Sequence, residues 1–183
     1  MASASKEGVI GKLNVRVVRG NNLAICDPLT HTSDPYVVLQ YGAQGLMDPR
    51  FQSLMPKLKT SVQKKNANPV WNEVLQLSVT NPTKSVHLEV FDEDKFTADD
   101  SMGVAYINLT DIYDAAKLDL KHVSNETRIK TIYPVGVNYL GDESHVTWND
   151  SKVVQDLTLK LTNVESGRIV LQLEWVYVPG VKL

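Results

Sequence analysis

Acidic side chains crowd one short window of this sequence. Residues 91–103 read FDEDKFTADDSMG and hold five acids against one lysine, Lys95. At an effective dielectric constant near 20, two carboxylates about 4 Å apart repel by roughly 4 kcal/mol, so a loop that keeps several together is stabilised by a cation. Oxygen-only ligands favour calcium over zinc, copper or iron. The window indicates a calcium site, and a solvated acidic turn is the alternative.

An EF-hand is another calcium-binding loop with a similar composition. Its third acidic ligand and its invariant glycine occupy set positions in the loop. Here Phe96 stands at the ligand position and Thr97 at the glycine position. We therefore do not expect an EF-hand.

A second acidic segment lies near the N-terminus. Asp27 follows the first predicted strand, and Asp34 precedes the next strand in the sequence SDPY. Loops that join alternate strands of a β-sandwich gather at one end of the fold. We therefore expect these two carboxylates to face three acids of the later window, which are Asp92, Asp94 and Asp100.

Basic and aromatic residues near these loops suit a membrane surface. A basic stretch contains Lys57, Lys59, Lys64 and Lys65, and a lysine near an anionic membrane contributes about 1 kcal/mol. The alternative is that lysines on an edge strand only discourage aggregation. Phe96 is expected at a loop tip, where burying its side chain in lipid is worth about 1.5 to 3 kcal/mol, with Lys95 at the level of the head groups.

The elements that position these loops are predicted to be strands. Within residues 12–18, Leu13, Val15 and Val17 alternate with polar residues, as in a strand with one buried face. Related patterns recur at residues 36–41, 75–79, 86–90, 156–161 and 169–178. We predict an all-β fold of about eight antiparallel strands in two facing sheets.

Two segments depart from this simple sandwich. Residues 42–56 form a long connection that is too apolar for a plain solvated loop. Thr110 or Asp111 is expected to cap a short helix that runs to about Lys117. The following residues, up to the strand near Val154, are an insertion before the last strands.

Length and composition fit one soluble domain. The chain has 183 residues, 43% hydrophobic and 22% charged, and its net charge is 19 − 21 = −2. These values argue against a disordered chain and a nucleic-acid-coating protein, so no nucleic acid partner is expected. No stretch has the length of a membrane span, and the N-terminus lacks the apolar centre of a signal peptide. Cys26 is the only cysteine, which excludes an internal disulfide and a cysteine-based zinc site.

Catalytic motifs are not recognisable in the sequence. It contains no nucleophile elbow, phosphate-cradling glycine loop or metalloprotease helix. We therefore expect a binding module and not an enzyme. Arg128 and Arg168 are candidates for stabilising charge on a transferred phosphate of a partner GTPase, although surface arginines are common.

Four motifs occur in an order that resembles calcium-dependent phospholipid-binding C2 domains. They are Asp27 with Ser33–Tyr36, Asn68–Glu73, Phe91–Asp94 and Asp99–Gly103. The resemblance implies an eight-stranded antiparallel C2 β-sandwich that binds about two calcium ions and anionic phospholipids, namely phosphatidylserine and phosphoinositides. It implies that Asp27, Asp34, Asp92, Asp94 and Asp100 are ligands and that Thr97 adds an oxygen, whereas Asp99 matches no ligand position. It also implies phosphoinositide binding by the lysine-rich strand.

The C-terminal part is similar to a plant subfamily, the C2-domain abscisic-acid-related proteins. Glu143–Trp148, Val154–Leu157 and Leu173–Trp175 carry this resemblance. It implies a single domain over residues 1–183, with a core at about 8–104 and 154–178 and an insertion at about 105–153. It also implies that the protein recruits abscisic acid receptors to the plasma membrane and is found in the cytoplasm and the nucleus.

Two other functions remain as hypotheses. A similar plant protein is described as a GTPase activator of an unconventional G protein, so a GTPase-activating regulator is the first. A calcium-independent protein-interaction scaffold is the second, and the full set of five aspartates argues against it.

Overall fold

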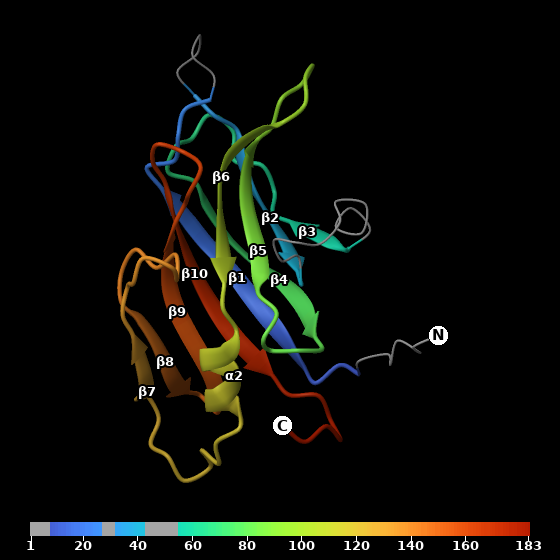
Figure 1. The fold of residues 1–183 in the computed structure, drawn as a ribbon, viewed down its shortest axis with the longest axis vertical. Coiled ribbons are helices and arrows are strands. Elements are labelled where there is room, and N and C mark those ends of the chain that lie inside the picture. The colour runs from blue at the N-terminus through green and yellow to red at the C-terminus, as the bar shows by residue number, and fades with distance from the viewer. Residues whose placement is uncertain (1–7, 27–31, 43–54) are drawn as a thin grey trace.

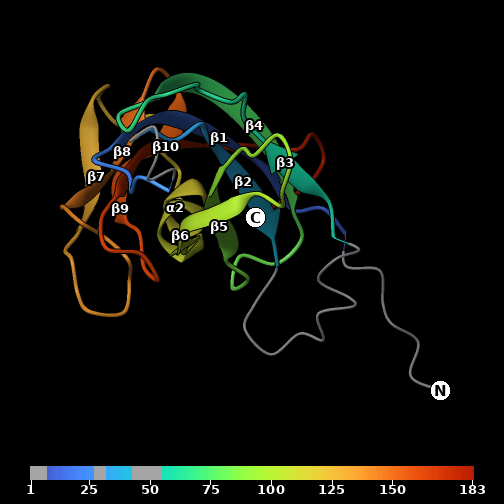
Figure 2. The same ribbon diagram turned by 90° about the horizontal axis from the view of Figure 1, so that it is seen from above.

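Two antiparallel sheets face each other in the structure, which is a computed structural model (Figures 1 and 2). It describes residues 8–26, 32–42 and 55–183. Within these residues, the six-stranded sheet has the order β4-β1-β10-β9-β8-β7, and the four-stranded sheet has the order β3-β2-β5-β6. The strands are β1 (Gly11–Asn21), β2 (Pro35–Tyr41), β3 (Lys57–Lys59), β4 (Val70–Val79), β5 (Val86–Asp92), β6 (Asp100–Ile107), β7 (Thr127–Ile132), β8 (Ser144–Asn149), β9 (Lys152–Lys160) and β10 (Arg168–Val176).

The predicted all-β antiparallel sandwich is confirmed, and it contains ten strands in its described part where about eight were expected. The difference comes mainly from β7 and β8, which lie within the residues predicted to be an insertion. β7 pairs with β8, and β8 pairs with β9, so the insertion extends the six-stranded sheet. The short strand β3 adds an edge to the other sheet by pairing with β2.

The alternating residues of β1 form the centre of the core. Leu13, Val15 and Val17 are fully buried, and they lie opposite Trp175, Leu173 and Leu171 of β10. Burying each such side chain is worth about 1.5 to 3 kcal/mol. This row of contacts therefore fixes which face of the six-stranded sheet packs inward.

A short helix, α2 (Thr110–Ala116), closes the lower end of the sandwich in Figure 1. Its Ile112, Ala115 and Ala116 are buried. The predicted helix is thus confirmed, but the predicted caps are wrong, because Leu109 is the N-cap residue and makes no side-chain cap hydrogen bond. Instead, the side chain of Asn108 accepts a hydrogen bond of 2.8 Å from the Thr110 N–H. Among the described helices, none is long and apolar enough to cross a membrane.

A bulge in β6, an edge strand of the four-stranded sheet, brings that strand against the segment that follows β9 in the six-stranded sheet. Gly103 has φ +109°, and the next residue, Val104, forms an isolated bridge with Thr162, which follows β9. A Cβ atom at Gly103 would lie 2.6 Å from a methyl carbon of Val164. Glycine therefore permits β6 to approach the β9–β10 connection closely.

Candidate calcium and membrane site

Three aspartates lie at positions where strands of the four-stranded sheet begin or end. Asp34 precedes β2, Asp92 ends β5, and Asp100 begins β6. Asp92 lies opposite Pro35 in one strand pair and opposite Asp100 in the other. We call this part of the molecule, with Asp94 in the loop that follows β5, the carboxylate end.

Backbone groups hold two of these carboxylates in place. The Asp34 N–H donates to Oδ1 of Asp92 over 2.6 Å, and the Lys65 N–H donates to Oδ1 of Asp34 over 2.8 Å. The Glu93 N–H also donates to the Asp34 carbonyl oxygen over 3.0 Å. These bonds join the β1–β2, β3–β4 and β5–β6 connections to one another.

Asp92 is the most buried of these acids, with 5% of its surface exposed. Burial raises the pKa of Asp92, and the neighbouring carboxylates of Asp34 and Asp94 raise it further. Hydrogen bonds from the Asp34 N–H and the Ser33 side chain act in the opposite direction, and the net shift is upward. The ionised form of Asp92 is therefore disfavoured unless a positive charge lies close to it.

The aspartates border a hollow of about 220 Å³. Its lining includes Asp34, Asp92 and Asp94, together with Lys65 and Phe96. Across the described ranges, no three His, Cys, Asp or Glu side chains are gathered closely enough to hold a metal ion, and Asp27 lies outside those ranges. The acidic groups offer only oxygen donors, so their chemistry fits a calcium ion.

Asp99 has a partner of its own. It accepts a hydrogen bond of 2.6 Å from the Tyr36 hydroxyl and one of 3.0 Å from the Asp94 N–H. The Tyr36 hydrogen bond lowers the pKa of Asp99. Asp99 thus connects the loop after β5 to β2.

Thr97 and Asp100, two further predicted ligands, have exposed side chains at the same end of the molecule.

Two apolar side chains project from the carboxylate end. Phe96, between β5 and β6, is 97% exposed, and Ile25, after β1, is 48% exposed. The Cys26 N–H next to Ile25 donates to Oγ of Ser33 over 2.9 Å, which places this loop beside Asp34. Sequence reasoning identified Phe96 but missed Ile25, because Leu23 and Ala24 beside it are equally apolar and are buried.

The four lysines of the basic stretch, which were predicted to contact lipid, form two groups. Lys57 and Lys59 share the exposed face of β3, as their alternation predicts, and Nζ of Lys59 lies 5.6 Å from the centre of the Tyr36 ring. Lys64 and Lys65 lie in the β3–β4 connection at the carboxylate end. Lys64 forms an exposed ion pair of 3.8 Å with Glu93.

The sandwich and its acidic end define a C2 domain, and residues 11–129 match the C2 domain family. The chain belongs to the C2 domain family, and within it to the plant proteins related to C2-domain ABA-related proteins. It is 41% identical over 180 residues to Protein C2-DOMAIN ABA-RELATED 5 of Arabidopsis thaliana, which covers 98% of this chain and 83% of the relative. It is 41% identical over 174 residues to GTPase activating protein 1 of Oryza sativa subsp. japonica, covering 95% and 96% of the two chains.

Solved structures share the fold. The C2A domain of plant Extended Synaptotagmin 1 has a TM-score of 0.58 at 20% identity and covers 93% of this chain and 98% of that one. A calcium-bound structure of the C2A and C2B domains of Extended-Synaptotagmin 2 has a TM-score of 0.59 at 22% identity, over 93% of this chain and 47% of that one. These similarities confirm the predicted C2 sandwich.

Proposed function

We propose that this protein binds anionic phospholipid membranes in a calcium-dependent manner through its carboxylate end. One observation carries the proposal. Asp34, Asp92 and Asp94 border one hollow, and Phe96, 97% exposed, stands at its margin. An acidic hollow needs a cation before it can approach an anionic surface, and an exposed aromatic side chain needs an apolar environment.

Asp34, Asp92, Asp94 and Asp100 would hold calcium together with Asp27 and Thr97. Five aspartates carry a charge of −5, and about two calcium ions would reduce it to −1. Calcium accepts six to eight oxygens, so it would supply positive charge and open positions for lipid phosphate. Phe96 and Ile25 would then enter the lipid, while Lys95 remains among phosphatidylserine or phosphoinositide head groups.

Vesicle sedimentation tests this proposal. The wild-type protein should sediment with phosphatidylserine vesicles in calcium and be released by chelator. The Asp92→Asn/Asp94→Asn double variant keeps the side-chain shapes and should lose most of the binding. Asp119→Asn, an exposed acid beyond α2, is the matched control and should bind normally. Equal binding of wild-type protein in chelator contradicts the proposal.

The β3 lysines support a second lipid contact, for phosphoinositides. Lys57 and Lys59 are exposed on the outward side of the four-stranded sheet, and Lys59 lies over the Tyr36 ring. At about 1 kcal/mol for each lysine, Lys57→Gln/Lys59→Gln should weaken binding to phosphoinositide vesicles by about 30-fold. Lys64→Gln/Lys65→Gln tests the lysines of the carboxylate end separately. An unchanged affinity in the first variant would leave β3 without a lipid role.

Recruitment of a signalling partner is the proposed outcome of membrane binding. The relatives are named as ABA-related, which supports a partner in abscisic acid signalling. We assign abscisic acid receptors as that partner and the cytoplasm, plasma membrane and nucleus as the locations. β7, the outer strand of the insertion, forms one edge of the six-stranded sheet and is the surface that we assign to this contact. A receptor should sediment with vesicles only when this protein and calcium are both present.

GTPase activation is the second candidate function, because a rice relative is named GTPase activating protein 1. Arg128 of β7 is exposed, whereas Arg168 is paired with Asp142 over 3.1 Å. Of the two arginines, Arg128 is therefore better placed to reach a partner. Single-turnover GTP hydrolysis by a candidate G protein should be accelerated by wild-type protein and not by Arg128→Ala, with Arg168→Ala as the comparison. An absence of acceleration by wild-type protein removes this candidate.

A further inference from the structure

An exposed apolar loop joins β7 and β8. Residues 133–141 read YPVGVNYLG and contain no charged side chain. Val137 is 85% exposed, Tyr133 is 62% exposed, and Val135 is 57% exposed. Leaving three neighbouring apolar side chains in water is unfavourable, so such a patch on a soluble protein usually marks a contact surface. We call residues 133–141 the insertion loop.

The insertion loop lies beside the four-stranded sheet. The ring of Tyr139 is 5.5 Å from that of Tyr106 on β6, which in turn is 5.0 Å from the ring of His87 on β5. These side chains are on the outward face of the sheet that also carries Lys57 and Lys59. Seen from above, the loop projects on the same side of the molecule as that face (Figure 2).

Asn138 satisfies much of the polar backbone of the insertion loop. Its Oδ1 accepts hydrogen bonds from the Val135 and Leu140 N–H groups over 3.1 and 3.2 Å, and its side-chain amide donates to the Tyr133 carbonyl oxygen over 2.9 Å. The Tyr139 carbonyl oxygen accepts the Lys160 N–H over 2.7 Å. These bonds pair part of the backbone of the loop inside the protein, which lowers the cost of moving that part out of water.

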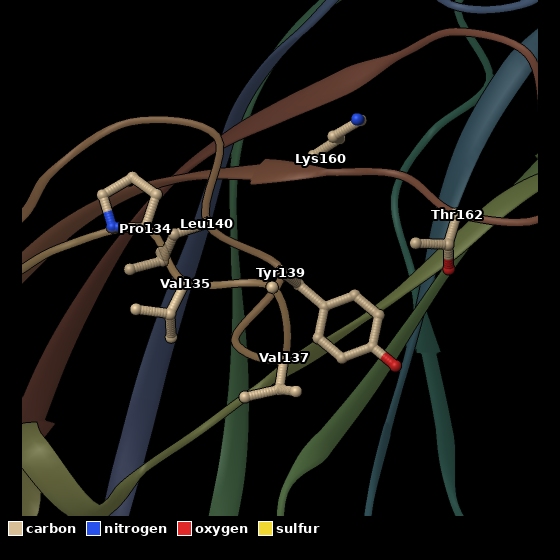
Figure 3. A pocket seen from close by; sticks show the side chains of 8 residues that line it. Pro134, Val135, Val137, Tyr139, Leu140, Lys160 and Thr162 are labelled. Carbon is tan, nitrogen blue, oxygen red and sulfur yellow. The ribbon is translucent and has the colours of Figure 1, made fainter.

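The charges near the insertion loop suit an anionic surface. Val135, Val137 and Tyr139 border one hollow of about 620 Å³ with the exposed Lys160 and with Thr162 (Figure 3). Lys160 forms no ion pair with an acid in the described part of the chain. The first acid after the loop, Asp142, is paired with Arg168, and Glu143 lies 4.0 Å from His145. The loop thus presents valines and a tyrosine beside an unneutralised cation.

We propose that the insertion loop is a second membrane-inserting element, which places Val135 and Val137 in the interfacial layer of an anionic bilayer. This inference rests on the proposed membrane function and adds an orientation to it. The four-stranded sheet faces the bilayer, with Lys57 and Lys59 at one edge and Lys160 beyond the other. Tyr133 and Tyr139 suit the head-group boundary, where amphipathic rings are favoured.

A fluorescent label can report the depth of the loop directly. In a Cys26→Ser background, single cysteines are introduced by Val137→Cys, Phe96→Cys or Val74→Cys and labelled with a polarity-sensitive dye. Val74 is the matched control, because it is an exposed valine, 47% accessible, on β4 of the opposite sheet. In calcium, phosphatidylserine vesicles should shift the dye emission to the blue at positions 137 and 96, with quenching by labelled acyl chains, and leave position 74 unchanged.

The positions at which the dye emission shifts distinguish the proposed membrane function from the proposed insertion of the loop. A shift at position 96 without one at 137 overturns the second insertion point and preserves the proposed function. No shift at either position overturns both. If position 137 responds only to an added soluble receptor and not to vesicles, the loop is a protein contact and the inference is wrong.

A charge substitution gives an independent measurement. Val137→Asp should raise the apparent vesicle dissociation constant by about tenfold or more, because the loop then carries a carboxylate into an anionic interface. Val74→Asp should leave it unchanged. Equal effects of the two variants, or none from Val137→Asp, would contradict the proposal.

Discussion

At the scale of single residues, the proposed role of Asp92 as a calcium ligand would link folding to cation binding. Burial and two neighbouring carboxylates raise the pKa of Asp92, so the folded state holds its proton more tightly than the unfolded state does. Without a cation, ionised Asp92 therefore opposes folding at neutral pH. This opposition disappears as the pH falls through the raised pKa, where the carboxyl is protonated in the folded state.

Asp92→Asn should therefore stabilise the protein in chelator at pH 7. Its urea midpoint should exceed that of the wild type, and the difference should shrink as the pH is lowered toward the pKa of Asp92. In calcium the order should reverse, since a ligand at 100 times its dissociation constant stabilises the folded state by about 2.7 kcal/mol. A lower midpoint for Asp92→Asn in chelator would mean that the hydrogen bond to the Asp34 N–H dominates.

Tyr36 is expected to set calcium affinity without being a ligand. Tyr36→Phe removes the hydroxyl that binds Asp99, and hydrogen bonds to charged groups contribute about 1.5 to 3 kcal/mol. The loop that carries Asp94 should become looser, and we expect calorimetry to show about a tenfold weaker calcium affinity. Tyr41→Phe is the matched control, because it loses a hydroxyl that donates to the Asn81 carbonyl oxygen instead. It should lower stability and leave calcium affinity unchanged.

At the scale of elements, the bulge in β6 connects the carboxylate end to the rest of the sandwich. Gly103 follows Asp100 by three residues, and the bridge from Val104 to Thr162 joins β6 to the segment after β9. The position of Asp100 therefore depends on a close approach that only a small residue allows. The same approach links the four-stranded sheet to Thr162, which borders the hollow beside the insertion loop.

Gly103→Ala should destabilise the fold by about 2 kcal/mol or more. A Cβ would overlap Val164 and strain a backbone with φ +109°. Gly136→Ala, in the insertion loop, has no atom within 4 Å of the added methyl group and should have little effect. Urea unfolding of both variants measures the difference. Equal free energies of unfolding for the two variants would show that the β9–β10 connection can move away from the added methyl group without loss of stability.

At the scale of the whole molecule, charge is arranged unevenly. The net charge is only −2, yet acids gather at the carboxylate end while lysines lie on β3 and beside the insertion loop. Cations at the acidic end would reduce the negative charge on the side of the molecule that is proposed to face the membrane. Membrane attachment should then combine calcium ligation, apolar insertion and diffuse attraction by exposed lysines.

Ionic strength should separate these contributions. The Debye length is about 10 Å at 0.1 M salt and about 3 Å at 1 M, so high salt removes attraction by exposed lysines first. In saturating calcium, vesicle binding of the wild type should weaken with salt, and that of Lys57→Gln/Lys59→Gln should weaken less steeply. Identical salt dependence of the two proteins in sedimentation assays would show that β3 does not face the membrane.

Much of the fold follows from local patterns in the sequence. Alternating residues such as Leu13, Val15 and Val17 determine that β1 is a strand with one buried face, because side chains alternate along any extended backbone. The insertion carries similar short patterns, but its pairing with β9 was not predictable. Strand pairing is decided by contacts between residues far apart in the chain. β8 pairs with β9, and the side of β9 that is open to such pairing depends on how the other strands of the sheet assemble.

The sequence by itself determined the chemistry of the site: acidic loops at the ends of predicted strands, with oxygen donors suited to calcium. Only the tertiary structure decided which side chains face which. In the folded protein, Asp99 accepts a hydrogen bond from Tyr36, and Ile25 is exposed whereas Leu23 is buried. Lys64 and Lys65 lie outside β3, the strand that carries Lys57 and Lys59. The physical reason is that the type of a residue determines what its side chain can bind, whereas the direction in which that side chain points depends on packing against segments distant in sequence.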